Sequence, residues 1–172
     1  MISRAIHIFP EFENIDIIND IRKKYDPLYK YIKPHITIIF PFNSILTSDQ
    51  IEIELTKLLM DFNPFTLEMD RITGHVDGYV FLNISKGMEK IIAIHDKLYS
   101  GKFSSFYDNR YTYIPHITLG RIGNREIFLE FLRENIKSKY KFRCLVKKIS
   151  VEIIHEDESS EIEYEYYLPL DW

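Results

Sequence analysis

The stretch "PHITIIF" (residues 34–40) returns later in the chain as "PHITLGR" (residues 115–121). Each copy places a histidine directly after a proline and a threonine two positions further on, within an apolar, β-prone run. An unpaired polar group buried in such a strand costs about 1–3 kcal/mol, so the repeat indicates a functional role. His35 and His116 stand 81 positions apart, close to half the chain. This spacing predicts an internal duplication.

Alternation along a strand determines where these side chains point. His35 and Thr37 fall on one face, about 6.6–6.8 Å apart along the chain, while the isoleucine between them falls on the other. The same holds for His116 and Thr118. If the two copies face each other, two imidazoles and two hydroxyls meet in a single cleft.

Two imidazoles on either side of a phosphodiester suit general acid–base catalysis. A pKa near 6.5 lets neutral and protonated rings coexist close to neutral pH. One ring can then take a proton from water or a ribose hydroxyl, while the other gives a proton to the leaving oxygen. Each transfer is typically worth about 10²–10⁴ in rate, and threonine hydroxyls can bind the non-bridging phosphate oxygens. This chemistry needs no metal and no cofactor, and we expect neither.

The apolar periodicity predicts strands and helices that alternate along the chain. Strands are predicted at residues 4–9, 35–42, 65–73, 78–84, around the second histidine motif, 142–156 and 162–170, and helices at 13–25, 47–62, 88–100 and 124–138. This order predicts an α+β fold in which two mostly antiparallel sheets form two pseudo-twofold lobes, with helices outside and a cleft between the lobes. No Pro-, Gly- or Ser-rich linker divides them, so we expect one domain over residues 1–172 made of two intertwined lobes.

The composition excludes several classes of protein. Hydrophobic residues make up 45% of the chain and the net charge is −4, so the protein can bury a core but lacks the general basic face that long nucleic acids require. The only cysteine, Cys144, excludes an internal disulfide. No apolar run approaches the length of about 20 residues that a membrane span needs, and the N-terminal residues lack the apolar core of a secretory signal. We therefore expect a cytoplasmic protein without membrane association.

The motifs "HITI" (residues 35–38) and "HITL" (residues 116–119) resemble the paired His-x-Thr/Ser-x motifs of the two-histidine phosphoesterase superfamily, also called 2′-5′ RNA ligase-like. The resemblance covers nearly the whole chain. It implies a bilobal fold with the active site in the groove between lobes. Activities in that family include opening 2′,3′-cyclic nucleotides or the cyclic phosphate of ADP-ribose, trimming 2′-5′ oligoadenylate or RNA ends, and reversible 2′-5′ RNA ligation.

The resemblance also implies roles for matching residues. The acid–base pair would be His35 and His116, with Thr37 and Thr118 as phosphate ligands, and which histidine is the acid stays open. Arg121 stands where many relatives carry a basic residue after the second motif. Strict alternation points Arg121 away from the histidines, but Gly120 could break that alternation. A phosphate contact by Arg121 is therefore left open.

Other residues near the motifs carry weaker signals. Aromatic rings that could stack on a base precede the two histidines at Tyr31, Tyr111 and Tyr113, and ordinary packing is the competing interpretation for each. Lys33 and Arg110 are favoured as solvated surface charges. A structural role is favoured for His7, although the first strand could also bring it to the cleft.

The sequence thus predicts a metal-independent phosphodiesterase acting on a 2′,3′-cyclic phosphate or another small nucleotide or RNA-terminal phosphodiester. A 2′-5′ RNA ligase activity at the same site is one alternative. A non-catalytic module that binds a nucleotide or RNA end is another. A metal-dependent phosphohydrolase is disfavoured, because no Asp, Glu and His cluster has ligand-like spacing. We expect a monomer with no obligate protein partner.

Overall fold

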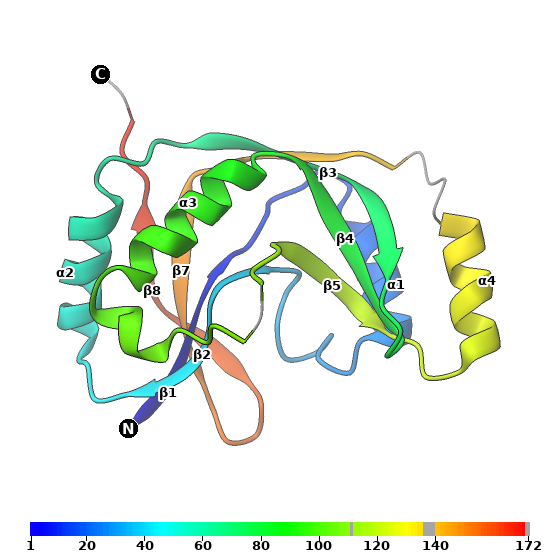
Figure 1. Cartoon of the computed structure of the whole chain (residues 1–172), viewed down its shortest axis with the longest axis horizontal. Coiled ribbons are helices and arrows are strands. Elements are labelled where there is room, and N and C mark those ends of the chain that lie inside the picture. Colours follow the sequence, from blue (N-terminus) through cyan, green and yellow to red (C-terminus); the bar gives the residue numbers. More distant parts are fainter. Residues whose placement is uncertain (111, 136–139, 171–172) are drawn as a thin grey trace.

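Strands and helices alternate along the chain in nearly the predicted order (Figure 1). The computed structural model describes residues 1–110, 112–135 and 140–170. The strands are β1 (Ile2–Ile8), β2 (Ile36–Ser44), β3 (Phe65–Gly74), β4 (Tyr79–Lys86), β5 (His116–Arg121), β6 (Phe142–Val146), β7 (Lys148–Ile154) and β8 (Ser160–Tyr167). The helices are α1 (Ile15–Tyr25), α2 (Ser48–Leu59), α3 (Met88–Tyr99), α4 (Arg125–Asn135) and the short 3-10 helix η1 (Lys102–Phe106). The predicted α+β class is confirmed.

The strands form one eight-stranded antiparallel sheet in the order β6-β3-β4-β5-β2-β1-β7-β8. The two histidine strands, β2 and β5, are neighbours at its centre, where a single residue pair, Ile36 with Ile117, joins them. We call β2, β1, β7 and β8 the His35 half and β5, β4, β3 and β6 the His116 half. The strand order is symmetric about the β2–β5 junction. The two predicted sheets are therefore the two halves of one sheet, related by a pseudo-twofold axis.

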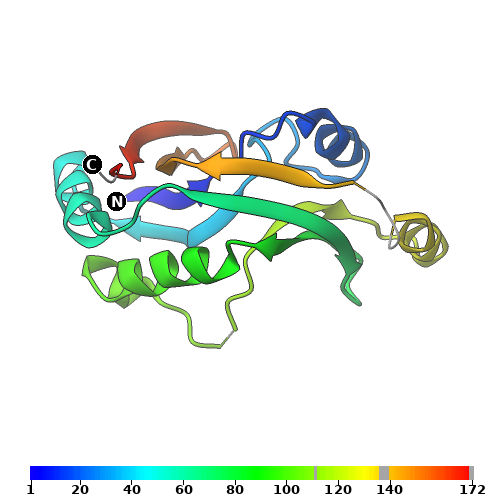
Figure 2. The same cartoon turned by 90° about the horizontal axis from the view of Figure 1, so that it is seen from above.

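The helices that follow equivalent strands are exchanged between the halves. Helix α1 follows β1 but packs on β5, whereas α3 follows β4 but packs on β2. Figure 2 shows α1 and α3 on opposite sides of the molecule, with α2 and α4 at its two ends. Buried apolar side chains from both halves belong to one continuous core. Each histidine strand is thus held in place by a helix from the other half.

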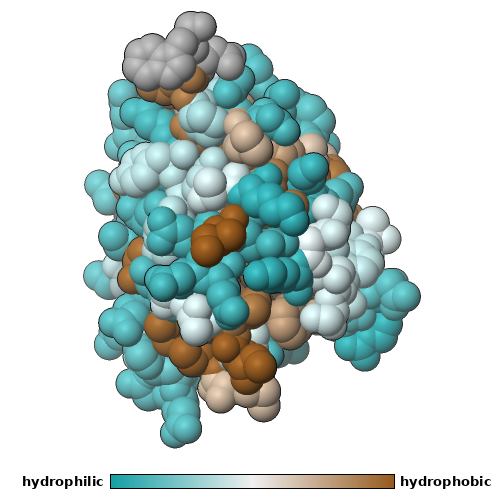
Figure 3. All heavy atoms as spheres, turned by 90° about the vertical axis from the view of Figure 1, so that its left-hand side faces the viewer, coloured by the Kyte–Doolittle hydropathy of each residue, from teal (hydrophilic) through white to brown (hydrophobic). Residues whose placement is uncertain are grey.

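The end of the molecule that carries α2 is mostly polar (Figure 3). The helix begins after Thr47, whose side chain forms a capping box with Gln50. Its buried face, which includes Ile51 and Leu55, packs into the core. Exposed apolar side chains such as Ile53 are set among charged ones on the outer face. Helix α2 therefore lies on the outside of the molecule, as the sequence predicts.

The segment predicted as one strand at residues 142–156 consists of two strands in different halves of the sheet. β6 pairs with β3 at one edge, and β7 pairs with β1 in the other half. Lys147 lies between them, and its carbonyl accepts a hydrogen bond from the backbone N–H of Leu168. The prediction of a single strand was wrong because no glycine or proline marks this crossing. β3 pairs with β4 and β7 pairs with β8 as antiparallel hairpins.

Candidate active site

The two His-x-Thr motifs lie side by side at the centre of the sheet. The pairing of Ile36 with Ile117 aligns the antiparallel strands β2 and β5. Continuing this register by one residue in each direction sets His35 opposite Thr118 and Thr37 opposite His116. The charge of His116 is among the causes that lower the pKa of His35, so the two imidazoles lie close enough to interact.

The face of the sheet that carries these four residues is the one not buried in the core. Ile36 and Ile117 are fully buried on the opposite face. The histidines and threonines of both motifs are only partly buried. The alternation predicted from the sequence is confirmed in both strands, and we call this side of the sheet the histidine face.

Both catalytic candidates are held by the same backbone contact. The Nδ1 atom of His35 lies 2.8 Å from the carbonyl oxygen of Lys33, and that of His116 lies 2.7 Å from the carbonyl oxygen of Ile114. A carbonyl oxygen only accepts hydrogen bonds, so Nδ1 carries the proton in both rings. In the neutral state Nε2 is then left with a free lone pair. Each half of the sheet thus presents one imidazole in the tautomer that can act as a base.

Burial keeps both rings neutral in the absence of a ligand. It lowers the pKa of His35 from 6.5 to about 4, with the Lys33 carbonyl opposing the shift and the charge of Arg22 adding to it. Burial also lowers the pKa of His116. An anion close to an imidazole favours its protonated form. A bound phosphate would therefore make protonation of one of the two rings easier.

The two histidines contact different rings at equivalent places in the sheet. The ring of His35 makes an edge contact with His7, with 4.5 Å between ring centroids, and the ring of His116 packs on Phe81 at 4.3 Å. His7 pairs with the threonine of the first motif and Phe81 with that of the second, so they occupy equivalent places. Nε2 of the buried His7 lies 3.4 Å from Oε2 of Glu152.

His7 thus lies beside the candidate acid–base pair. The sequence had favoured a structural role for His7 over a place near the cleft. Burial, with His35 nearby, holds the pKa of His7 well below its ordinary value. The signal that could have identified this position is its alternation with Ile6 and Ile8, which face the core. This alternation indicates a place beside His35 only when β1 is known to pair with β2.

A bulge at Gly120 turns Arg121 toward the histidine face. In the pairing of β5 with β4, Thr118 stands opposite Phe81 and Arg121 opposite Tyr79, with an irregular register between these pairs. The Arg121 guanidinium lies 5.1 Å from the centre of the Tyr79 ring, and its Nε donates to the carbonyl of Asp77 at 3.0 Å. The register therefore puts Arg121 on the same side as Thr118, at the edge of the face.

Replacing Gly120 with alanine should destabilise the fold by about 3 kcal/mol. The residue has a φ of +145°, and an added Cβ would lie 2.6 Å from the carbonyl carbon and oxygen of Tyr25. Gly123, with nothing within 4 Å of its added Cβ, provides the matched control. Urea unfolding should show a clear loss of stability for Gly120→Ala and little change for Gly123→Ala. Equal unfolding midpoints would contradict the tight approach of α1 to β5.

The three tyrosines considered for base stacking have different surroundings. Tyr113 stacks on His95 with 3.7 Å between centroids and donates its hydroxyl to the carbonyl of Thr37 at 2.7 Å. One face of its ring is therefore already covered, and it supports the first motif. Tyr31 is 42% exposed and lines a cavity beside His35. Tyr111 lies outside the described residues.

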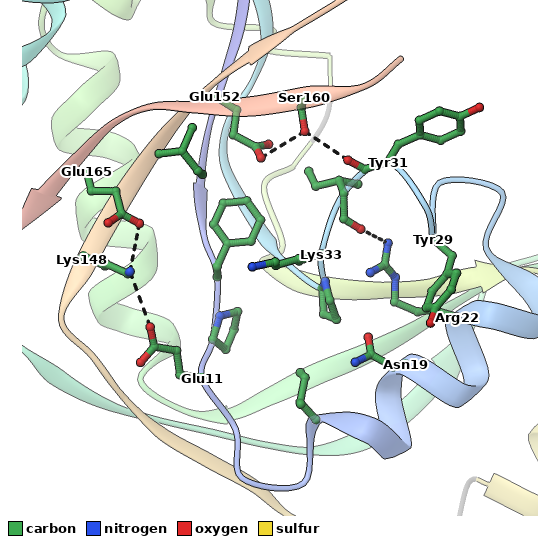
Figure 4. A pocket seen from close by; sticks show the side chains of 16 residues that line it. Glu11, Asn19, Arg22, Tyr29, Tyr31, Lys33, Lys148, Glu152, Ser160 and Glu165 are labelled. Atoms are coloured by element: carbon green, nitrogen blue, oxygen red, sulfur yellow. Dashed lines mark hydrogen bonds and ion pairs between the residues drawn. The ribbon is translucent and has the colours of Figure 1, made fainter. Parts of the chain in front are cut away.

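That cavity has a volume of 680 Å³ and lies between strands of the His35 half, α1 and the loop before β2 (Figure 4). Lys33 and Pro34, which directly precede His35, form part of its wall. Phe9 also lines it, and the ring of Phe9 lies 6.1 Å from that of His35. Neither histidine of the motifs lines the cavity itself, so it is a separate space that adjoins the candidate site.

The sequence matches the 2′-5′ RNA ligase superfamily over residues 9–158. The chain belongs to this superfamily. Among similar proteins, one from Bacillus thuringiensis (strain Al Hakam) and one from Bacillus anthracis (strain CDC 684 / NRRL 3495) are both named "Putative phosphoesterase". Each is 31% identical to this superfamily member over 122 residues, which is 68% of either chain.

Solved structures show the same fold at much lower sequence identity. E. coli LigT complexed with 3′-AMP has a TM-score of 0.62 and 16% identity, and the alignment covers 98% of this superfamily member and 99% of LigT. The protein TT0787 of Thermus thermophilus has a TM-score of 0.64 and 13% identity, with 96% and 97% covered. At these identities the similarity concerns the fold. The predicted 2′-5′ RNA ligase-like architecture is thereby confirmed.

Across residues 1–110, 112–135 and 140–170 of this superfamily member, no group of three or more His, Cys, Asp or Glu side chains gathers as metal ligands would. None of the helices in that part of the chain has the length and apolar character of a membrane span.

Proposed function

We propose that this superfamily member is a phosphodiesterase in which His35 and His116 act as the acid–base pair. The observation that supports this most directly is the shared geometry of the two rings. Each fixes its Nδ1–H on a backbone carbonyl and leaves Nε2 free on the same face of the sheet. Relatives named as phosphoesterases agree with an enzyme of this kind.

In the proposed reaction the scissile phosphate lies between the two imidazoles. The hydroxyls of Thr37 and Thr118 donate hydrogen bonds to its non-bridging oxygens, and Arg121 adds a cation at the edge of the site. The neutral imidazole takes a proton from the attacking water. The protonated imidazole gives a proton to the leaving oxygen as the P–O bond breaks. Which of the two histidines is the acid depends on how the substrate is oriented.

The proposed substrate is a 2′,3′-cyclic phosphate or another small nucleotide or RNA-terminal phosphodiester. LigT is recorded in complex with 3′-AMP, a mononucleotide with a terminal phosphate, which supports this substrate class. The net charge of −4 also favours a short substrate over a long one. RNA processing is the corresponding biological setting that we propose.

A 2′-5′ RNA ligase activity is the second candidate, favoured by the family to which the chain belongs. Ligation would use the same residues, with a ribose hydroxyl in place of water as the nucleophile. A non-catalytic module that binds a nucleotide or an RNA end is the third. Such a module needs phosphate ligands but does not need two imidazoles held in the same tautomer, so the geometry favours the enzyme.

The test is hydrolysis of the four nucleoside 2′,3′-cyclic monophosphates by the wild-type protein, with and without EDTA. Turnover that EDTA does not affect is expected, because both proton transfers are assigned to side chains. The position of the phosphate in the product identifies the oxygen that leaves. Measurable nucleotide binding without turnover would instead favour the binding module. An activity that EDTA abolishes would overturn the metal-independent mechanism.

A further inference from the structure

The cavity beside His35 has a buried cation with an unused hydrogen-bond donor. Arg22 of α1 is 1% exposed and lines the cavity. Its Nε contacts Asp26 at 2.7 Å and its Nη2 donates to the carbonyl of Ile32 at 2.8 Å. The third nitrogen, Nη1, is buried without a hydrogen-bond partner. A buried donor left unpaired is costly, so an acceptor brought by a ligand would stabilise this site.

A second cation extends into the same space. Figure 4 shows the side chain of Lys33 pointing into the cavity, with no ion pair or hydrogen bond to the other residues drawn. The remaining lysine of the wall, Lys148, contacts Glu165 at 2.9 Å and Glu11 at 3.6 Å. The Nε of Arg22 is paired with Asp26, so the cationic groups that remain for an anion are its unpartnered Nη1 and the ammonium of Lys33. A guanidinium and an ammonium together favour a phosphate group.

The rest of the wall suits a nucleoside. Tyr31 offers a ring that is 42% exposed, and Ile162 of β8 provides an apolar surface that is 46% exposed. On the side of the cavity away from Arg22, Glu152 accepts a hydrogen bond from the Ser160 hydroxyl at 3.1 Å (Figure 4). Its Oε2 lies 3.4 Å from Nε2 of His7. A carboxylate keeps further lone pairs beyond one such bond, so this side of the cavity can accept from a ribose hydroxyl or an amino group of a base. The cavity thus combines stacking surface, acceptor and cations, as nucleotide recognition requires.

We propose that this cavity binds the nucleotide unit next to the reacting one, with its phosphate on Arg22 and Lys33. This inference rests on the proposed function, because it assumes that the scissile phosphate lies at His35 and His116. It narrows the substrate class to an RNA terminus, in which a second phosphate follows the reacting nucleotide. An isolated cyclic mononucleotide would leave the cavity empty.

The test compares two substrates that differ by one phosphate: adenosine 2′,3′-cyclic phosphate and its 5′-phosphorylated form. The wild-type protein should show a KM about tenfold lower for the phosphorylated form. In Lys33→Ala this preference should disappear, because the cation is lost while the backbone carbonyl that holds His35 is kept. Lys57→Ala, on the remote helix α2, is the matched control and should keep the preference.

The outcomes separate this inference from the proposed function. Equal KM values for the two substrates in the wild type, or a preference that Lys33→Ala leaves intact, would overturn the second-phosphate site while hydrolysis still stood. If neither substrate is hydrolysed, the proposed function fails, and calorimetric titration with adenosine 5′-phosphate decides the inference. Binding about tenfold weaker in Lys33→Ala than in Lys57→Ala would then support the site, and equal binding would overturn it.

Discussion

Alanine at position 35 or 116 should lower kcat by about 10²–10⁴ on any substrate that the wild-type protein turns over. Each substitution removes the only group that we assign to one of the two proton transfers. The neighbouring imidazole cannot replace it, because its own Nδ1 is occupied by a backbone carbonyl and its Nε2 has the opposite role. The measurement is single-turnover kinetics of His35→Ala and His116→Ala.

A control and a double variant make this result specific. His75→Ala removes an exposed imidazole from the β3–β4 turn and should leave kcat unchanged. The double variant should be about as inactive as either single one, because groups that act as a unit have non-additive effects. Circular dichroism and urea unfolding of each variant establish that the fold is retained. A folded His116→Ala protein with near-wild-type kcat would refute the two-histidine mechanism.

Replacing Glu163 with glutamine should destabilise the protein by about 3 kcal/mol at neutral pH. The side chain of Arg4 is 0% exposed and that of Glu163 is 7% exposed. Arg4 Nη2 donates to Glu163 Oε1 at 2.7 Å, and Nε contacts the other oxygen. The amide of glutamine would leave this guanidinium buried without its counter-charge. Urea unfolding at pH 7 measures the loss.

The pH dependence of this pair has a defined sign. The hydrogen bonds from Arg4 lower the pKa of Glu163 below its ordinary value of 4.5. The pair therefore stabilises the fold fully above pH 4.5, and this contribution is lost as the pH falls through the folded pKa. The difference in free energy of unfolding between the wild type and Glu163→Gln should accordingly become smaller at acid pH. Glu161→Gln, at an exposed position of the same strand, should cost little at either pH. A difference in free energy of unfolding that stays the same at neutral and acid pH would contradict the assigned ion pair.

The sequence predicted the placement of the two motifs better than that of the residues around them. Alternation alone was enough to assign His35 and Thr37 to one face, because that period is a local property of any strand. The place of His7 depends on which strands are neighbours, and strand order is not encoded in any single stretch. Arg121 depends on a bulge, which Gly120 permits but does not require.

No local sequence pattern predicted the cavity or the crossing of the chain between the two halves of the sheet at Lys147. Arg22 occupies a helix position that sequence alone would assign to a solvated charge, and the loop before β2 is what buries it. The run from 142 to 156 has the composition of one continuous strand, and the tertiary structure divides it between the two halves of the sheet. In both cases contacts distant in sequence determine the outcome.

The exchange of α1 and α3 between the halves has a consequence for how the protein folds and opens. Because each histidine strand packs under a helix from the other half, neither half can be cut out or melted while the other keeps its packing. Many contacts in this protein join residues that are far apart in the chain, and such a high contact order slows folding. Unfolding should accordingly be all-or-none. A protease that needs a locally unfolded segment should cleave at the edges of the molecule and not at the β2–β5 junction. A protein molecule that has escaped cleavage should therefore keep both imidazoles in place.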